Sequence, residues 1–253
     1  MSELSELKEF CGILADSSAE IIRGYFRQKF SIEEKKDLSP VTIADKKAEE
    51  LMRKLIMKEF PNHGIVGEEF GIYKPEAEYQ WILDPIDGTK SFICGAHTFG
   101  TMIGVLYKGE PILGVINQPV LKEYMIGDNK NTYLNGEKTA VRYCNNMSEA
   151  VLLTTDHLNV EKYQNIEKFN NLIHMVKLYR MWGDCYGYLL LAAGYTDIMI
   201  DPIMNIWDLS ALIPIIKGAG GVITDFKGGN AIKGESIIAA SPVIHKQVLE
   251  ILN

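Results

Sequence analysis

From about residue 148 onward, the sequence alternates between short apolar segments and longer helix-like segments. The short segments are rich in Val, Ile and Leu, as buried strands are, and the longer ones carry apolar residues at helical spacing. This alternation predicts a mixed sheet that is covered by helices. The expected strands cover 150–155, 176–180, 196–200, 221–224 and 236–240, and the expected helices cover 160–174, 185–194, 208–218 and the segment from Pro242.

The first half of the chain has a different pattern. Apolar residues three and four positions apart predict a packing helix over 4–26, and Thr42 suits the N-cap of a second helix that ends near Pro61. A glycine turn at Gly109 and the Asn-Gly hairpin signal in 134–137 predict a largely antiparallel sheet. Its expected strands include 65–67, 80–83, 98–107 and 111–117.

These patterns predict an α/β chain of mixed α+β type, without internal repeats or a Pro/Ser-rich linker. We expect two halves that pack closely around a shared cleft. The expected halves are 1–145, which carries Glu68 and the D-P-I-D-G-T motif, and 146–253, which carries Asp208 and the pocket for the rest of the substrate.

Composition and charge narrow the function classes. With 47% apolar residues, the 253-residue chain can bury a substantial core, and a net charge of −7 argues against a nucleic-acid-binding surface. The four cysteines lack disulfide or zinc spacing, so we expect reduced thiols. The N-terminus does not resemble a signal peptide and no apolar run reaches membrane-spanning length. We therefore expect a cytoplasmic protein that acts on a small molecule.

Two acids stand three positions apart in WILDPIDGTKS, residues 81–91, where an expected strand ends. Taken alone, Asp84 and Asp87 suit a turn, because Asp, Pro and Gly each favour one. A neighbouring expected strand is followed by Glu68, which alone suits a surface acid. Asp208 opens an apolar helix, where it suits an N-cap.

Together these four acids supply only oxygen ligands. With the carbonyl oxygen of Ile86 between the two aspartates, the set suits a hard divalent cation, Mg²⁺ above all. Four carboxylates in one cleft would repel one another strongly unless cations entered. Mg²⁺ commonly serves phosphate chemistry by neutralising phosphate oxygens and activating water, so we expect a phosphate-bearing substrate. The backbone amides of Gly88 and Thr89 suit an anion cradle beside it.

The motifs D-P-I-D-G-T at 84–89, G-E-E at 67–69, and W-D-x-x-A with A-G-G within 207–221 resemble the inositol monophosphatase family of Mg²⁺-dependent, lithium-sensitive phosphatases. The resemblance covers most of the chain in the family's order. It implies a layered α/β/α/β/α sandwich, a homodimer and two or three Mg²⁺ ions per site. It also implies that the metal ligands are Glu68, Asp84, the Ile86 carbonyl, Asp87 and Asp208.

The resemblance further implies how water is activated. In the family, the threonine of D-G-T works with an upstream aspartate to orient and deprotonate the attacking water, and here these residues are Thr89 and Asp45. A threonine hydroxyl accepts the proton of water only if its own hydrogen is drawn elsewhere, which a carboxylate does. Glu68 is expected to assist as a third catalytic residue. Lys36 is expected to approach the phosphate, and a solvated surface charge is the alternative.

The stretch 179–202 resembles the bacterial histidinol-phosphatases of this family, at G-D-C-Y-G-Y and at M-I-D-P. Histidinol phosphate carries an ammonium group, which carboxylates such as Asp184 and Asp201 would favour, and Tyr186 suits the imidazole. Each of these three also suits a structural role, as a cap, a turn or a core residue. Arg180 suits either the phosphate or a bond to Asp184, and a surface salt bridge is the alternative. Lys90 stands where relatives carry arginine, which weakens any bidentate contact there.

The residues expected to contact substrate are therefore Glu68, Ile86, Asp87, Gly88, Thr89, Arg180, Asp184, Asp201 and Asp208. The predicted activity is Mg²⁺-dependent hydrolysis of L-histidinol phosphate in histidine biosynthesis. Two alternatives stay open, an inositol-1-phosphatase or broad sugar-phosphate phosphatase, and a regulatory protein like the family's transcription antitermination relative. The complete set of acids argues against a purely non-catalytic role.

Overall fold

The computed structural model describes residues 3–29, 32–34 and 40–253. Two sheets dominate the structure, and a short hairpin-like pair, β1 (Ile32–Glu34) and β2 (Pro40–Thr42), precedes them. Lys36, for which a role at the phosphate was predicted, lies outside the described residues.

The larger sheet has eight strands in the order β10-β9-β8-β7-β6-β5-β3-β4. The β3–β5 pair is parallel, and the other neighbouring strands in this sheet are antiparallel. This confirms the prediction of a largely antiparallel sheet. The strands are β3 (Gly64–Gly67), β4 (Gly71–Tyr73), β5 (Tyr79–Asp87), β6 (Gly100–Tyr107), β7 (Glu110–Gln118), β8 (Glu123–Gly127), β9 (Thr132–Leu134) and β10 (Glu137–Thr139).

The smaller sheet has five strands in the order β12-β11-β13-β15-β14. It is mixed, because β11 runs parallel to β12 and β13, whereas β15 is antiparallel to both of its neighbours. Its strands are β11 (Val151–Thr154), β12 (Leu178–Arg180), β13 (Ile198–Asp201), β14 (Val222–Thr224) and β15 (Ile237–Ala240).

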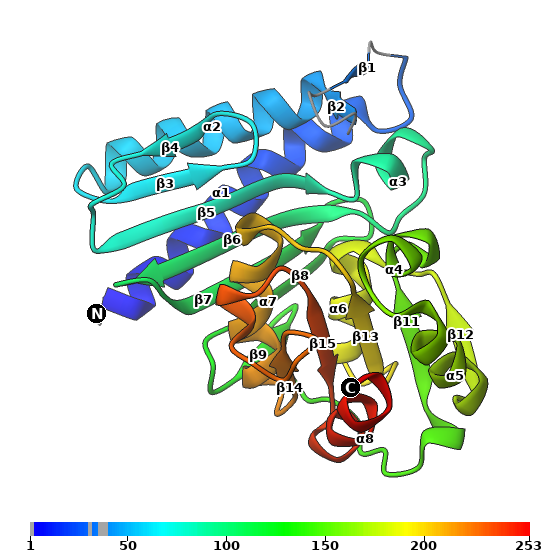
Figure 1. Ribbon diagram of the computed structural model, residues 1–253. Helices are drawn as coiled ribbons and strands as arrows, with labels where there is room; N and C mark the ends of the chain where they lie inside the picture. The colour runs from blue at the N-terminus through cyan, green and yellow to red at the C-terminus, as the bar shows by residue number, and fades with distance from the viewer. Residues whose placement is uncertain (1–2, 30–31, 35–39) are drawn as a thin grey trace.

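The helices form three layers around the two sheets (Figure 1). The outer layer on the larger sheet contains α1 (Glu3–Tyr25) and α2 (Ile43–Glu59), the middle layer contains α6 (Asp184–Ala192) and α7 (Ile206–Gly218), and the layer on the far side of the smaller sheet contains α4 (His157–Tyr163), α5 (Ile166–Met175) and α8 (Pro242–Leu252). The predicted α/β/α/β/α sandwich is therefore confirmed.

Alternating side chains of the smaller sheet serve both neighbouring layers. On β13, Met199 belongs to the core around α6 and α7, whereas Ile198 and Ile200 belong to the core under α5 and α8. The two-residue period of a strand explains this division, and it is why these segments read as continuously apolar.

Tight packing brings α7 against the larger sheet. A Cβ atom at Gly114 would lie 1.9 Å from the backbone oxygen of Ala211, so only glycine allows this approach of helix and sheet. The close packing fixes the first turn of α7 relative to β5 and β6, and this turn carries Asp208.

The predicted turns are present with the expected conformations. Asn135 and Gly136 both have positive φ, 50° and 86°, between β9 and β10. Lys108 and Gly109 likewise have φ of 50° and 82° between β6 and β7. Positive φ at both central residues is the requirement of a two-residue hairpin of type I′, which confirms the Asn-Gly signal.

Two predicted boundaries are wrong. The helix expected over 160–174 is two helices, α4 and α5, because the Asn165 side chain accepts a hydrogen bond from the Lys168 N–H and starts a new helix. The strand expected to end at Leu83 continues as β5 to Asp87. Its register against β6 shifts between Asp84 and Asp87, so an extra residue is accommodated there as a bulge.

The division of the chain near residue 145 stays a prediction. The larger sheet ends in sequence at Thr139 and the smaller sheet begins at Val151, but α6 and α7 from the second half pack against strands of the first. Within the described residues, none of the helices has both the length and the apolar character needed to cross a membrane.

Candidate functional site

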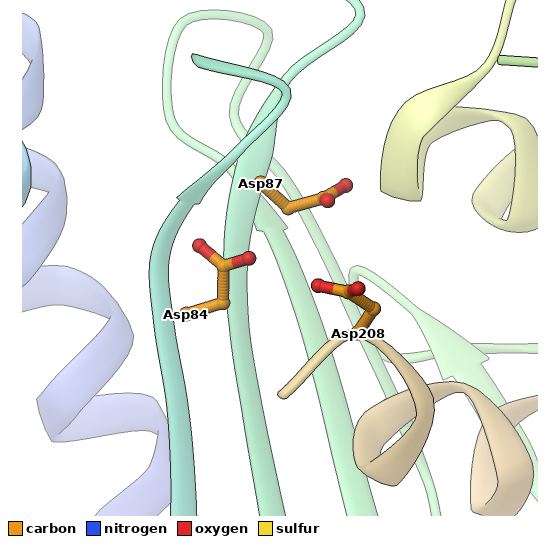
Figure 2. A group of neighbouring side chains, drawn as sticks. All are labelled: Asp84, Asp87 and Asp208. Atoms are coloured by element: carbon orange, nitrogen blue, oxygen red, sulfur yellow. The ribbon is translucent and has the colours of Figure 1, made fainter. Parts of the chain in front are cut away.

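Three aspartates that are distant in sequence meet at the end of β5. Asp84 and Asp87 come from the bulged end of this strand, and Asp208 comes from the first turn of α7. One carboxylate oxygen from each lies within 4.8 Å of the other two. Figure 2 shows the three side chains converging on one small volume. The bulge changes the direction of the strand between Asp84 and Asp87. Without it, the regular pleat of the strand would set the directions of these two side chains.

The start of α7 orients Asp208. Asn205 is the N-cap of the helix, and Asp208 is its third residue, whose Oδ2 accepts the Asn205 N–H at 2.7 Å. The capping-box geometry therefore holds the carboxylate at the helix terminus. The alternative that Asp208 is itself the N-cap is wrong.

A second helix contacts the cluster through its backbone. The Cys185 N–H, at the start of α6, donates a short hydrogen bond to Asp87 Oδ2. Burial raises the pKa of Asp87 well above its usual value, and the charges of Asp184 and Asp208 add to the shift. For Asp84, burial is again the largest cause of a raised pKa, followed by the charges of Glu68, Asp87 and Asp208.

The cluster fits a hard cation. Asp84 Oδ1 is buried and has no hydrogen-bond partner among the described residues, and such an orphaned acceptor is costly unless an ion satisfies it. Burial and the charges of Glu68 and Asp201 raise the pKa of Asp208 to about 7, although the Asn205 amide opposes the shift. A divalent cation would relieve the repulsion among these carboxylates, and their all-oxygen chemistry suits Mg²⁺.

Glu68 lies at the opening of the same site. It follows β3 directly, and its backbone N–H donates to the Leu83 carbonyl on β5 at 3.1 Å. With Asp87, Gly88, Thr89 and Asp208, it lines a cavity of about 360 Å³. The four predicted carboxylates are therefore brought to one place, although the ligand role of each stays a prediction.

Gly88 and Thr89 connect β5 to α3 (Thr89–Ile93). Gly88 has a φ of 83°, and a Cβ atom there would lie 2.8 Å from the Asp184 carboxyl group, so glycine is required on both counts. The helix α3 begins directly after Gly88, which is its N-cap residue.

Asp45 and Thr89 have separate hydrogen bonds in this structure. The Thr89 hydroxyl donates to the Ile86 carbonyl at 3.1 Å. Asp45 Oδ2 accepts from both the backbone N–H and the hydroxyl of Thr42, while Asp45 Oδ1 is buried without a partner among the described residues. Burial raises the pKa of Asp45 to about 6. Asp45 therefore has one committed oxygen and one available acceptor.

A second cavity of about 150 Å³ shares Asp87, Asp184 and Asp208 with the first and extends between the two sheets. Asp201, at the end of β13, lies in its wall and is buried. Its Oδ1 accepts the Thr155 N–H at 3.0 Å, and its Oδ2 accepts the Tyr188 hydroxyl at 2.9 Å. Burial raises the pKa of Asp201 to about 7.

Asp184 lines both cavities. It has a φ of 50°, which is unusual for a residue other than glycine. Its backbone N–H donates to the Thr155 hydroxyl at 2.9 Å, and its Oδ2 accepts the Ser91 hydroxyl at 2.7 Å. Burial raises the pKa of Asp184 to about 6. These contacts hold the carboxylate between α3 and α6.

Arg180 and Tyr186 are not among the described residues that line either cavity, whereas Lys90 is. Arg180 is exposed and donates to the Tyr179 carbonyl. Tyr186 packs against the core between the sheets and hydrogen-bonds to Glu123. Lys90 lines the larger cavity.

Thr155, Asn159 and Tyr188 also line the site and were not predicted. Thr155 is the last residue of an expected strand, and a polar residue at a strand end is the signal that would have identified it. Tyr188 lies inside an apolar helix sequence, where nothing distinguishes it from a core residue.

Comparison with known proteins gives a consistent result. Residues 3–253 match the model of the inositol monophosphatase family. The chain is 46% identical to the chloroplastic bifunctional phosphatase IMPL2 of Arabidopsis thaliana, over 99% of this chain and 78% of that protein. It is 36% identical to a histidinol-phosphatase of Chlorobaculum parvum, over 93% of this chain and 92% of the relative.

The fold comparison agrees. An inositol monophosphatase from Zymomonas mobilis superimposes with a TM-score of 0.89 at 36% identity, covering 100% of this chain and 99% of that one. Proteins of this family are metal-dependent phosphatases, typically with Mg²⁺, and the acidic cluster at the end of β5 and the start of α7 suits such an ion. The chain belongs to the inositol monophosphatase family and is a phosphomonoesterase of that type.

Proposed function

We propose that this phosphatase hydrolyses L-histidinol phosphate to L-histidinol and phosphate, with Mg²⁺ as its cofactor. The observation that carries the proposal is the pair of additional acids, the half-buried Asp184 and the buried Asp201, in the cavity next to the three-aspartate cluster. A neutral polyol gains little from two more carboxylates that are largely removed from water. An ammonium group beside them supplies the charge that offsets their burial.

The arrangement of the cavities divides the substrate between them. The phosphate group fits the larger cavity, among Glu68, Gly88 and Thr89. The alcohol part fits the deeper cavity, where Asp201 and Tyr188 form one wall and apolar residues such as Met102 and Leu212 form another. The imidazole and the ammonium group of histidinol match this mixture of apolar and acidic surface.

In the proposed reaction, water attacks phosphorus, the bond between phosphorus and the histidinol oxygen breaks, and that oxygen gains a proton. Bound Mg²⁺ would neutralise phosphate oxygens, favour deprotonation of water and stabilise the leaving oxygen. Glu68, Asp84, Asp87 and Asp208, with the Ile86 carbonyl, are the residues that would hold two or three ions.

The residues of this chain orient the water and move its proton. Thr89 directs its hydroxyl hydrogen to the Ile86 carbonyl, so its oxygen lone pairs are free to accept from water. Asp45 contributes its buried Oδ1, an acceptor without a partner among the described residues, which would receive the proton that the attacking water loses. Glu68, as a metal ligand, assists from the metal side.

A second candidate is an inositol-1-phosphatase or a broad sugar-phosphate phosphatase. The close superposition on the Zymomonas mobilis inositol monophosphatase favours it, and both activities would use the same metal carboxylates. The name of the Arabidopsis thaliana relative, a bifunctional phosphatase, is compatible with both substrates.

Three further parts of the proposal rest on family resemblance, namely a role in histidine biosynthesis, a homodimeric state and inhibition by Li⁺. A cytoplasmic location is a fourth part, and it rests on the sequence patterns alone. Sedimentation velocity tests the dimer directly, and phosphate release with and without Li⁺ tests the inhibition.

The deciding experiment compares kcat/KM for L-histidinol phosphate and inositol 1-phosphate side by side, at saturating Mg²⁺. We expect a preference of at least about 10-fold for histidinol phosphate, because Asp184 and Asp201 pair with its cationic group. A preference for inositol 1-phosphate would reject histidinol phosphate as the substrate and leave the second candidate.

A further inference from the structure

Glu49 is a fully buried acid that no step of the proposed reaction uses. It lies on α2, one helical turn after Asp45 and on the same face of the helix, which points toward the larger sheet. The described residues that line the two cavities do not include it. A buried carboxylate is costly unless it is hydrogen-bonded, so its partners indicate its role.

The Glu49 carboxylate holds the turn that carries Glu68. Its Oε2 accepts the Glu69 N–H at 2.8 Å, and its Oε1 accepts the Phe70 N–H at 3.1 Å. Glu68 itself is fixed from the other side, because its N–H donates to the Leu83 carbonyl on β5. Three successive amides between β3 and β4 are therefore tied to neighbouring elements.

Arg53 and Glu49 together form a clamp on the turn between β3 and β4. Arg53 follows Glu49 by one helical turn, its side chain is 11% exposed, and its Nη1 lies 3.1 Å from Glu49 Oε1. The same Nη1 donates to the Gly71 carbonyl at 2.9 Å, at the start of β4. The pair from α2 thus contacts the turn along its length.

The residue before Glu68 is shaped for this contact. A Cβ atom at Gly67 would lie 1.9 Å from Glu49 Oε1 and 2.4 Å from the carboxyl carbon. Because the carboxylate is buried and held by three donors, it has little room to withdraw. Only glycine at position 67 lets the Glu49 carboxylate lie beneath the turn.

We propose that Glu49, supported by Arg53, is a positioning residue that fixes Glu68 for metal binding and so sets the metal affinity of the site. The inference rests on the proposed role of Glu68 as a metal ligand. It links α2 to the metal site twice, through Asp45 at the water and through Glu49 at the Glu68 turn.

The test measures binding of Mn²⁺ alone, as a spectroscopic substitute for Mg²⁺, by electron paramagnetic resonance of the free ion. In Glu49→Gln, the amide keeps one acceptor, and its NH₂ group faces an N–H donor of the turn. We expect the Kd for Mn²⁺ to rise about 10- to 100-fold, as is typical when a residue that orients a metal ligand is lost.

Glu50→Gln is the matched control. Glu50 is the next residue of α2 and also pairs with a basic residue four positions later, Lys54, but both side chains are more than half exposed. We expect its Kd to stay within about twofold of the unmodified protein, because exposed pairs contribute little.

Glu68→Gln separates the inference from the function on which it rests. If Glu68→Gln leaves Mn²⁺ binding unchanged, Glu68 is not a metal ligand, and the inference fails at its premise while the three-aspartate site stands. If Glu68→Gln weakens binding and Glu49→Gln lowers only the Tm, Glu49 has a purely structural role and the inference is overturned.

Arg53→Met is the variant to use if Glu49→Gln does not fold. It removes the guanidinium contacts to Glu49 and to the Gly71 carbonyl and leaves both hydrogen bonds from the turn amides to the Glu49 carboxylate. A Kd increase of about threefold or more supports the inference, and an unchanged Kd contradicts it. In either variant, the Mg²⁺ concentration for half-maximal activity should rise with the Kd, while kcat at saturating Mg²⁺ is largely restored.

Discussion

The two ends of the site treat buried acids differently. At the end of β5, Asp84 keeps a buried oxygen without a hydrogen-bond partner among the described residues, in a group of carboxylates that repel one another. At the end of β13, both oxygens of Asp201 accept hydrogen bonds, from Thr155 and Tyr188. The first arrangement needs ions to be stable. The second has its hydrogen bonds supplied by the protein, but its charge stays unpaired, so it is suited to present one negative wall to a cationic substrate.

This difference suggests a division of labour. The carboxylates at the end of β5 and the start of α7 would set the reaction rate. Those of Asp201, at the end of β13, and Asp184, at the start of α6, would select the alcohol. Substitutions at the first end should therefore change kcat and metal dependence for every ester. Substitutions at the second end should change KM for cationic esters in particular.

The largest effect is expected for Asp87→Asn. Because losing a residue that only orients a ligand costs about 10- to 100-fold, losing a carboxylate ligand should lower kcat/KM by about 10³-fold and abolish normal activation by Mg²⁺. Phosphate release measured over a Mg²⁺ titration tests this. Activation at the usual Mg²⁺ concentration would remove Asp87 from the ligand set.

A smaller loss is expected for Asp45→Asn. The substitution keeps an acceptor for the Thr42 capping bonds, so the variant should fold, but it removes the carboxylate that draws the proton. We expect kcat to fall by about 10²-fold with little change in KM. Steady-state kinetics of the purified variant give the answer, and a near-normal kcat would exclude Asp45 from the mechanism.

The smallest effect is on stability, in EDTA. Asp201 and Asp208 have pKa values raised to about 7, whereas an aspartate in the unfolded chain titrates near 4. Between these values the folded protein binds more protons than the unfolded one, so stability rises as pH falls through this window. We expect the Tm to increase by at least about 4 °C from pH 7.5 to 5.5.

Mg²⁺ and Asp201→Asn divide this pH effect between the two ends. Saturating Mg²⁺ should remove the contribution of Asp208, because a bound cation keeps that carboxylate charged. Asp201→Asn should remove the other contribution and leave the response to Mg²⁺ intact. A Tm that falls on acidification in EDTA would show that these acids are not destabilising when charged.

The sequence predicted the three-aspartate cluster at the end of β5 better than the surroundings of Asp184 and Asp201, for a physical reason. Metal ligands are strongly constrained in residue type, so acids at strand ends and at the start of a helix are informative, and the structure brings Asp84, Asp87 and Asp208 together. The bulge that aims the first two is not visible in the sequence, because bulges depend on pairing with a second strand.

The surroundings of Asp184 and Asp201 depend on tertiary packing. Tyr188 lies in an apolar helix and reaches Asp201 only because α6 packs between the sheets. Arg180 was predicted to contact the phosphate or Asp184, but Asp184 at the start of α6 accepts the Ser91 hydroxyl on α3, and Arg180 donates to the Tyr179 carbonyl. The hairpins and the alternation of strands and helices were predictable because turn chemistry and apolar period are local. The layer order came only from the resemblance to the family.

The most direct test of this division of labour is the ratio of kcat/KM for L-histidinol phosphate to that for inositol 1-phosphate, measured in the unmodified protein and in Asp201→Asn. The substitution keeps the acceptor for the Thr155 amide, removes the charge and places an NH₂ group where Oδ2 accepts the Tyr188 hydroxyl. We predict that the ratio falls by about 10-fold or more, while kcat/KM for inositol 1-phosphate changes by less than about threefold. Equal losses for both esters would contradict the account, because Asp201 would then serve the reaction and not the choice of alcohol.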